Sequence, residues 1–396
     1  MTDRIPIVIS GIGSVCSLGI CEGRVLNTVQ PLSEIDNWPA QKHKFASLVK
    51  KFNPSTIVKG LKTRRLDNLS VWTLVASALA LKNAGIDHTA VQSVRKAIVF
   101  GAGFGCLILS ENFLQGISEH GLAQSDPIVF PETLDNFPAA HFAQQFNFQG
   151  ANITFNAKGI SGEAALLFGA DLIACAEADL VIVAAGDTLT RSLFDWYEKM
   201  NVLSSQANAS SGRITPFCFD NDGFIPGEGV CACVLEPAKN LNDRNKNAIA
   251  TFIGGNISFD PTAGSINWGK KSRVLTELAS TVISQYINEP ISLIISSVNG
   301  SKELNLLEAQ TIIDLAVDAD VIAPKCLFGE FEGSGLLRLV SALSGSGDRI
   351  ENNTILDKAQ NIHLRHMGNI RESVKTALLL GTSTGGGKAA LLFKFT

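Results

Sequence analysis

Two glycine-rich segments are the first candidates for chemistry in this sequence. Gly11-Ile12-Gly13 follows a β-branched run and is similar to a dinucleotide-binding turn, but Cys16 stands where close helix packing asks for Gly or Ala. We interpret it as a tight turn after the first strand. Residues 381–388 are similar to a phosphate loop, but Thr382 replaces its first glycine and Ala389 its magnesium-binding hydroxyl. Nucleotide binding is therefore not expected.

The cysteines and histidines do not form a metal-ligand pattern. Cys231 and Cys233 alternate along a predicted strand, and His363 and His366 have no acidic or thiol partner nearby in the sequence. We therefore expect no metal site. The eight cysteines, most of them in apolar runs, indicate buried side chains in the reducing environment of the cytoplasm.

Residues 213–229 form the most informative segment, Arg-Ile-Thr-Pro-Phe-Cys-Phe-Asp-Asn-Asp-Gly-Phe-Ile-Pro-Gly-Glu-Gly. It resembles the central loop of β-ketoacyl synthases of the thiolase fold, in which Pro-Phe and an acidic Asp-Gly-Phe cluster precede Gly-Glu-Gly and a strand. Residues 64–67 resemble the segment before that family's first long helix, and residues 178–187 the strand after its nucleophile helix. The resemblance covers essentially the whole chain.

The resemblance implies decarboxylative Claisen condensation by a cysteine at a helix N-terminus and two histidines. Gly159, in Asn156-Ala157-Lys158-Gly159-Ile160-Ser161-Gly162, stands at the position of the nucleophile. The first histidine is lost after Asn299, and Glu330 stands at the position of the second. All three catalytic side chains are absent, so we do not expect the chain to catalyse condensation alone.

Two further positions match the family. Glu308 and Lys325 correspond to residues that pair structurally there, so we expect a buried pair that stabilises the fold. The glycine-rich segment 381–386 corresponds to the gating loop of the family, but it lacks both phenylalanines of that loop.

A ketosynthase without its nucleophile resembles the chain-length factor of type II polyketide and aryl-polyene systems. That resemblance implies a heterodimer with an active ketosynthase that encloses an acyl tunnel, and phosphopantetheine-linked acyl chains delivered by an acyl carrier protein. No cofactor bound directly to this chain is implied. The tunnel and gating positions, where bulky side chains would shorten the product, are Phe104, Leu107, Glu111, Val129 and Phe130. Residues 127–131 resemble an interface strand with its cap.

Two other functions remain open. The first is an acyltransferase or decarboxylase of the same fold that uses Ser161 or Lys158 in place of the missing cysteine. The second is a homodimeric protein that binds acyl chains without a ketosynthase partner.

The elements that position these residues alternate between strands and helices, which predicts an α/β fold with helices covering a sheet. We expect strands at 5–9, 96–100, 153–155 and 180–185, and helices at 70–84, 106–116 and 162–177. A second series begins at 248, with helices at 272–286, 304–317 and 333–344 and strands at 291–298 and near 378 and 391. We therefore predict a duplicated αβαβα architecture with two mixed sheets, divided into residues 1–240 and 241–396.

Composition agrees with this interpretation. The 396 residues are 45% hydrophobic and 18% charged, which is enough apolar material for a large core and excludes a disordered chain. With a formal net charge of −4, no broad basic surface for nucleic acid is expected. No apolar run approaches the length of a membrane span, so we expect a soluble cytoplasmic protein.

Overall fold

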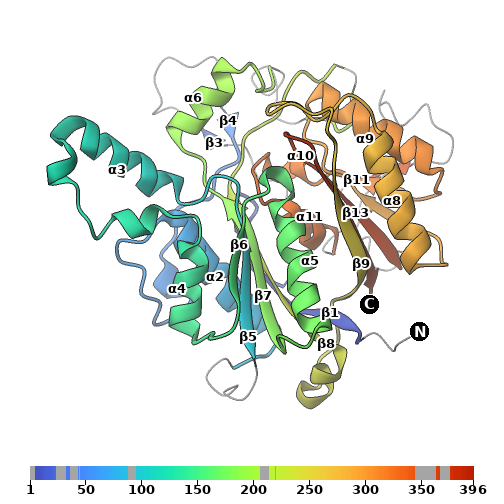
Figure 1. Cartoon of the computed structure of the whole chain (residues 1–396), viewed down its shortest axis with the longest axis horizontal. Coiled ribbons are helices and arrows are strands. Elements are labelled where there is room, and N and C mark those ends of the chain that lie inside the picture. Colours follow the sequence, from blue (N-terminus) through green and yellow to red (C-terminus); the bar gives the residue numbers. More distant parts are fainter. Residues whose placement is uncertain are drawn as a thin grey trace.

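The computed structural model describes residues 5–23, 33–35, 43, 45–87, 95–205, 214–218, 220–343, 363–365 and 375–396. Figure 1 shows helices and strands stacked in five layers, with helices outermost, two groups of strands inside them, and α5 and α11 in the middle. The expected αβαβα layering is therefore confirmed. Of the recognised loop at 213–229, Arg213 and Phe219 lie outside the described residues, as does His366.

Each half of the chain contributes five principal strands. The first five are β1 (Ile7–Cys16), β5 (Lys96–Gly101), β6 (Asn152–Phe155), β7 (Leu180–Asp187) and β8 (Gly229–Pro237). The second five are β9 (Ala250–Phe259), β10 (Leu293–Ile295), β11 (Asp320–Ile322), β13 (Thr376–Thr382) and β14 (Gly387–Phe395). Numbered within its own half, each set lies in the spatial order 3-2-4-5-1, with strands 2, 3 and 4 parallel. The duplication predicted from element order is thus present in the topology.

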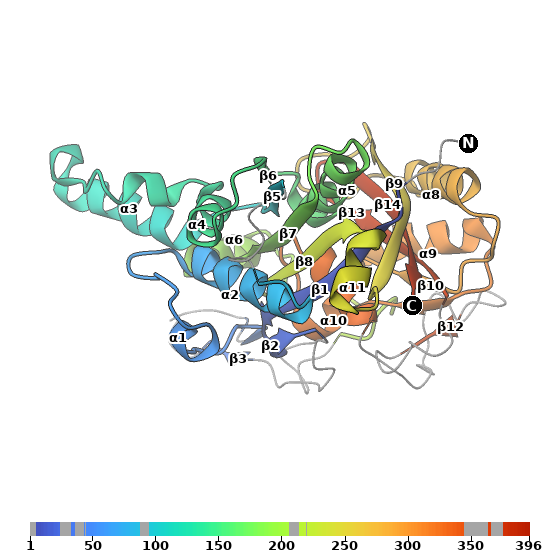
Figure 2. The ribbon, with the colours of Figure 1, turned by 90° about the horizontal axis from the view of Figure 1, so that it is seen from below.

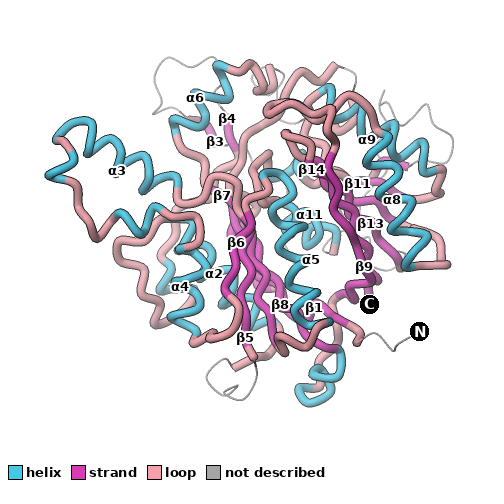
Figure 3. The backbone as a smooth tube through the Cα atoms, viewed as in Figure 1, coloured by secondary structure: helices cyan, strands magenta, loops and turns pink. Residues whose placement is uncertain are grey.

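The two sets of strands are joined edge to edge. β1 pairs antiparallel with β9 through Ile7–Phe252, Val8–Thr251 and Ile9–Ala250. Together with β2 (Gly19–Glu22) and β12 (His363–Leu364), these ten strands form one twelve-stranded sheet; strands are magenta in Figure 3. A separate pair joins β3 (Ser33–Glu34) to β4 (Phe45–Ala46). The two expected mixed sheets therefore exist as the halves of one hydrogen-bonded sheet.

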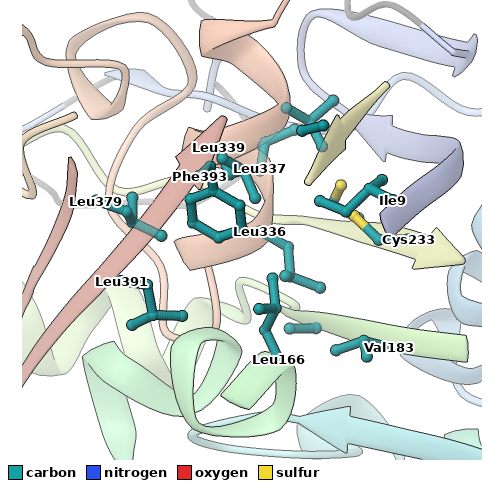
Figure 4. Packing of buried hydrophobic residues seen from close by; sticks show 14 of the residues in the cluster. Ile9, Leu166, Val183, Cys233, Leu336, Leu337, Leu339, Leu379, Leu391 and Phe393 are labelled. Carbon is teal, nitrogen blue, oxygen red and sulfur yellow. The ribbon is translucent and has the colours of Figure 1, made fainter. Parts of the chain in front are cut away.

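Helices cover both faces of each half-sheet. The outer layers contain α2 (Asn68–Asn83) with α4 (Phe137–Phe146) on one side and α8 (Arg273–Tyr286) with α9 (Lys302–Leu315) on the other. The middle layer contains α5 (Ser161–Ala174) and α11 (Gly335–Ala342), which are apolar on most of their surface because strands flank them on both sides. Figure 4 shows this central packing, in which Leu166 and Leu336 lie with Leu391 and Phe393.

A buried ion pair links the two helices of the middle layer. The Arg338 guanidinium on α11 bonds to the Glu163 carboxylate on α5, and neither side chain is exposed to solvent. Each half of the chain supplies one partner, so the pair fixes the halves against each other.

The remaining elements lie at the ends of the strands and on the surface. They are α1 (Pro54–Ile57), α3 (Leu107–His120), η1 (Leu122–Gln124), η2 (Phe130–Thr133), η3 (Lys158–Ile160), α6 (Arg191–Lys199), η4 (Ala238–Arg244) and α10 (Lys325–Phe328). Figures 1 and 2 show α3 extending away from the layers.

The predicted turn at Gly11–Gly13 is wrong. Both glycines lie inside the ten-residue strand β1, which is buried along its whole length. A Cβ atom on Gly11 would lie 2.2 Å from the Ala80 carbonyl oxygen, and one on Gly13 would lie 2.1 Å from the Ala76 carbonyl oxygen. The glycines are needed because α2 crosses the strand in direct contact with its backbone, a distant contact that the local sequence does not reveal.

The strand expected at 127–131 is also wrong. Residues 127–129 form a turn that leads into the 3-10 helix η2. Pro131 at the start of η2 cannot donate a hydrogen bond to a sheet, whereas the first turn of a helix needs no such donor.

Candidate functional site

The candidate site lies where the carboxyl ends of equivalent strands from the two halves meet. β5 and β10 lead to Gly103 and Asn299, and β6 and β11 lead to the segments that carry Gly159 and Glu330. Loops at the carboxyl ends of parallel strands are the usual place for a site in a sheet of this type. The structure therefore brings together the three positions that the sequence analysis associated with lost catalytic residues.

A cleft of about 440 Å³ opens at this place. Its walls are largely aromatic, and its polar lining comes from loops of both halves. The lining includes Phe104, Trp196, Tyr197, Phe224, Trp268, Asn156, Lys158, Ser265, Ser301, Glu303, Glu330, Glu332 and Thr384. We call it the central cleft.

Gly159 stands at the turn before α5. Lys158 adopts a left-handed conformation with φ of 50°, which lets the chain reverse sharply between β6 and the helix. The Gly159 N–H donates to Ser383 Oγ at 3.1 Å, so this amide is already used within the protein. A Cβ atom on Gly159 would find the Glu332 carboxylate oxygen and the Thr382 carbonyl oxygen each at 3.3 Å. The sharp turn before α5 is therefore present, but Gly159 offers no side chain at the expected position of the nucleophile.

Glu330 is held by two neighbours. Lys325 Nζ donates to both of its carboxylate oxygens, at 2.7 and 2.9 Å, and Asn299 Nδ2 donates to one of them at 2.6 Å. All three residues are buried. Asn299, Lys325 and Glu330 thus form a hydrogen-bonded group around an ion pair, and none of the three is a histidine.

The predicted pair between Glu308 and Lys325 is wrong. Lys325 pairs instead with Glu330, five residues later in the chain. Glu308 accepts from Ser296 Oγ at 2.6 Å, the Ser297 amide at 2.9 Å and Thr382 Oγ1 at 2.8 Å. Hydroxyl and amide donors therefore satisfy Glu308, and Lys325 bonds to Glu330 instead.

Glu332 is a candidate functional residue that the sequence analysis did not identify. Its carboxylate lines the central cleft beside Gly159, and the described residues give it no hydrogen-bond partner. Burial raises the pKa of Glu332 to about 7, and the negative charge of Glu330 adds to this effect. Near neutral pH the group therefore exchanges between a neutral acid and a carboxylate. The only signal in the sequence was its place in Gly329-Glu330-Phe331-Glu332-Gly333.

Asp187, at the end of β7, positions the loop that forms one wall of the cleft. It accepts hydrogen bonds from the amides of Gly103 at 2.7 Å and of Phe104 and Gly105 at 3.0 Å each. Burial raises the pKa of Asp187 well above its usual range, while these amides oppose the shift. The three bonds fix the backbone from which Phe104 reaches the cleft.

The five predicted tunnel residues do not lie together. Phe104 lines the central cleft, and Leu107 packs beside it in a cluster with Leu189 and Phe194. Glu111 accepts a hydrogen bond from Thr190 Oγ1 at 2.6 Å. Val129 lines a separate surface hollow beside Arg64 and His141, and Phe130 is exposed. Of the five, the structure brings only Phe104 to the central cleft.

The two substitute nucleophiles are engaged elsewhere. Ser161 is buried, and its Oγ accepts from the Ala157 amide at 2.9 Å and lies 2.9 Å from the Ala102 carbonyl oxygen, to which it can donate. Lys158 Nζ donates to the Ser265 carbonyl oxygen at 2.9 Å. Neither side chain is presented as a nucleophile.

A search of the described part of the chain finds no group of three His, Cys, Asp or Glu side chains arranged to hold a metal ion. In the same residues, no helix combines the length and apolarity needed to cross a bilayer.

Solved structures share this fold over nearly the whole chain. One, titled "The ishigamide ketosynthase/chain length factor", is 18% identical with a TM-score of 0.84 and covers 99% of this chain and 100% of that one. Another, a type II polyketide synthase acyl-carrier protein in complex with its ketosynthase bound to the hexaketide, is 15% identical with a TM-score of 0.82, covering 100% of both chains. These likenesses establish the thiolase-like fold.

Sequence relatives include 3-oxoacyl-[acyl-carrier-protein] synthases. The chloroplastic synthase I of Hordeum vulgare is 23% identical over 65% of this chain, and synthase 2 of Vibrio cholerae is 25% identical over 55% of it. The matches span 58% and 53% of those relatives, little more than half of their length. The sequence model of the family described as "Beta-ketoacyl synthase, N-terminal domain" matches residues 29–240, which is more than half of the chain. This protein therefore belongs to the β-ketoacyl synthase family.

Proposed function

We propose that the chain is a non-catalytic chain-length factor, which pairs with an active β-ketoacyl synthase and shapes the acyl tunnel for a polyketide or polyene. The observation that carries the proposal is Gly159 at the N-terminal turn of α5, with the ion pair of Glu330 and Lys325 nearby. Among the described residues that line the central cleft, none is a cysteine or a histidine. A cleft with this lining offers acyl-chain volume without the nucleophile of the condensation.

A projecting apolar surface supports the proposal of a partner. The segment 107–134, which we call the α3 arm, contains a fourteen-residue helix without a single buried residue. Leu114 is 64% exposed and Leu122 is 72% exposed, and Ile128, Phe130 and Leu134 add to the same exposed apolar set. Exposed apolar side chains gathered on one projecting segment are typical of a protein interface. We assign the active ketosynthase to this surface.

Co-expression with a β-ketoacyl synthase that has an intact Cys-His-His set tests the proposal. We expect a stable one-to-one complex that condenses acyl groups, and no activity once the partner's nucleophilic cysteine is replaced by alanine. Incubating this chain alone with thioesters of an acyl carrier protein should leave its mass unchanged. A covalent adduct on the isolated chain would instead support an enzyme with altered chemistry, and a homodimer that ignores the ketosynthase would support an acyl-binding protein.

Substitution in the α3 arm tests the interface. Leu114→Glu places a charge in the proposed contact and should abolish co-purification with the ketosynthase. Leu306→Glu, on α9 and 44% exposed, is the matched control and should leave the complex intact. Equal recovery of both variants in the complex would exclude the α3 arm as the interface.

The proposal also covers how acyl chains reach the complex and the compartment in which it works. The acyl chains would arrive as phosphopantetheine thioesters on an acyl carrier protein, as the family resemblance implies. The eight cysteines form no disulfide, which agrees with a reducing cytoplasm.

A further inference from the structure

We propose that Glu332 recognises the ligand of the central cleft by donating a hydrogen bond from its neutral carboxyl group to a carbonyl oxygen, such as that of an acyl thioester. The inference deepens the proposed function, since it assumes that acyl groups enter this cleft.

The position of Glu332 is the first argument. Its carboxylate oxygen lies 3.3 Å from the place of a Cβ atom on Gly159, so it occupies the space beside the vacant nucleophile position. A Cβ atom on Gly103 would lie 2.3 Å from Glu332 Cβ, so only glycine at 103 leaves room for this side chain. Glu332 is therefore built into the wall of the cleft.

The second argument is the contrast between Glu332 and Glu330. Glu330 receives three hydrogen bonds from Lys325 and Asn299, whereas the described residues offer none to the Glu332 carboxyl group. A polar group with no protein partner in a largely aromatic cleft favours a ligand that completes its hydrogen bonding.

The charge state decides which ligand group fits. Burial raises the pKa of Glu332 to about 7, so a substantial fraction carries a proton at neutral pH and can donate. The charged and titratable groups whose fields act on Glu332 or that face the cleft are Glu330, Lys325, Lys158, Glu163, Asp187, Tyr197 and Glu303. Lys325 is bound to Glu330, and the Lys158 ammonium is bound to the Ser265 carbonyl, so no described cation is bonded to Glu332. A neutral carbonyl ligand is thus compatible with the acid form.

Binding of hexanoyl-pantetheine to the purified full-length chain tests the inference, with the fluorescence of Trp196 and Trp268 in the cleft wall as the signal. Affinity should be constant at acidic pH and fall about tenfold per pH unit above about 7, as the donor is lost. Glu332→Gln, which keeps an N–H donor, should bind at all pH values without this dependence. Glu332→Leu should lose binding at least about tenfold.

Glu303→Gln is the matched control, because Glu303 lines the same cleft and its removal should leave the pH dependence intact. An unchanged pH profile in Glu332→Gln would overturn the inference. Tighter binding of hexylammonium than of the thioester, rising with pH, would also overturn it, because the carboxylate would then be a receptor for cations. Complex formation with the ketosynthase is measured separately, so loss of the complex with retained thioester binding would reject the proposed function and keep this inference.

Discussion

The carboxylate of Glu332 lies 3.3 Å from the point that a Cβ atom on Gly159 would occupy. The structure thus places an acidic group directly beside the position that the family resemblance assigns to the nucleophilic thiol. Restoring the thiol alone would set it against a like charge, and a thiolate next to a carboxylate is destabilised.

Gly159→Cys should therefore yield a poorly reactive thiol. We expect it to react with iodoacetamide several-fold faster at about pH 8 in the Gly159→Cys, Glu332→Gln double variant than in the single variant, because the amide carries no charge. Mass spectrometry of the peptide that contains position 159 separates this reaction from that of the exposed Cys175. Equal rates in the two variants would show that the Glu332 charge does not reach this site.

Removing Lys325 should destabilise the fold. Lys325→Met leaves the buried Glu330 carboxylate without its cation, which costs about 3–5 kcal/mol in the free energy of unfolding. Arg273→Met breaks an exposed pair with Glu277, which solvent screens, and should leave the unfolding midpoint almost unchanged. Urea unfolding of both variants measures the difference, and a loss of similar size in the two would contradict a structural role for Lys325.

Stability should depend on the protonation of Glu228. This buried carboxyl accepts from the amides of Val49 at 2.9 Å and Leu189 at 3.0 Å, and burial raises its pKa from 4.5 to about 7. The folded state then binds the proton more tightly than the unfolded state. The free energy of unfolding should fall as the pH rises from about 4.5 to about 7, by up to about 3 kcal/mol, and then level off.

Glu228→Gln should reduce that slope, whatever its effect on absolute stability, because the amide does not titrate. Urea unfolding across the pH window measures the slope for both proteins. The same slope in the variant would assign the pH dependence to other groups, of which Glu332 is one.

Two glycine-to-alanine substitutions should change the free energy of unfolding in opposite directions. Gly13→Ala puts a methyl group 2.1 Å from the Ala76 carbonyl oxygen and should cost about 3 kcal/mol or more, because β1 and α2 must separate. Gly116→Ala, inside α3 with nothing within 4 Å of the new methyl, should stabilise by up to about 1 kcal/mol. Thermal unfolding checks both signs, and a harmless Gly13→Ala would mean that the strand and the helix are not in direct contact.

Phe104→Ala should alter the products of the reconstituted complex. Removing the ring enlarges the central cleft, so we expect longer chains or a broader distribution of lengths. Phe252→Ala is the matched control, because Phe252 on β9 packs against Phe393 and lies outside both the central cleft and the α3 arm. An unaltered product profile in Phe104→Ala would remove Phe104 from the tunnel.

Helices and strands could be predicted from the sequence, whereas contacts between distant segments could not. Apolar runs and helical spacing located α2, α5 and β7 to within a few residues because the pattern of each element reflects its own burial. Gly11 and Gly13 were misread because their purpose is contact with a helix more than sixty residues away. The lining of the central cleft could not be predicted from local sequence, since Glu332 lies against Gly103 and Gly159, which are on separate loops of the other half of the chain.

The pairing of β1 has a consequence for the order of folding. β1 hydrogen-bonds to β8, the last strand of the first half, and to β9, the first strand of the second half. During synthesis β1 can pair early only with β2, and its pairing with β8 and β9 cannot be complete until Phe252 has been made; such long-range closure is slow. A fragment that ended at the predicted division after residue 240 would leave Ile7–Ile9 as an open strand edge, a known route to aggregation. We expect the two halves, although alike in topology, to fold only as one unit.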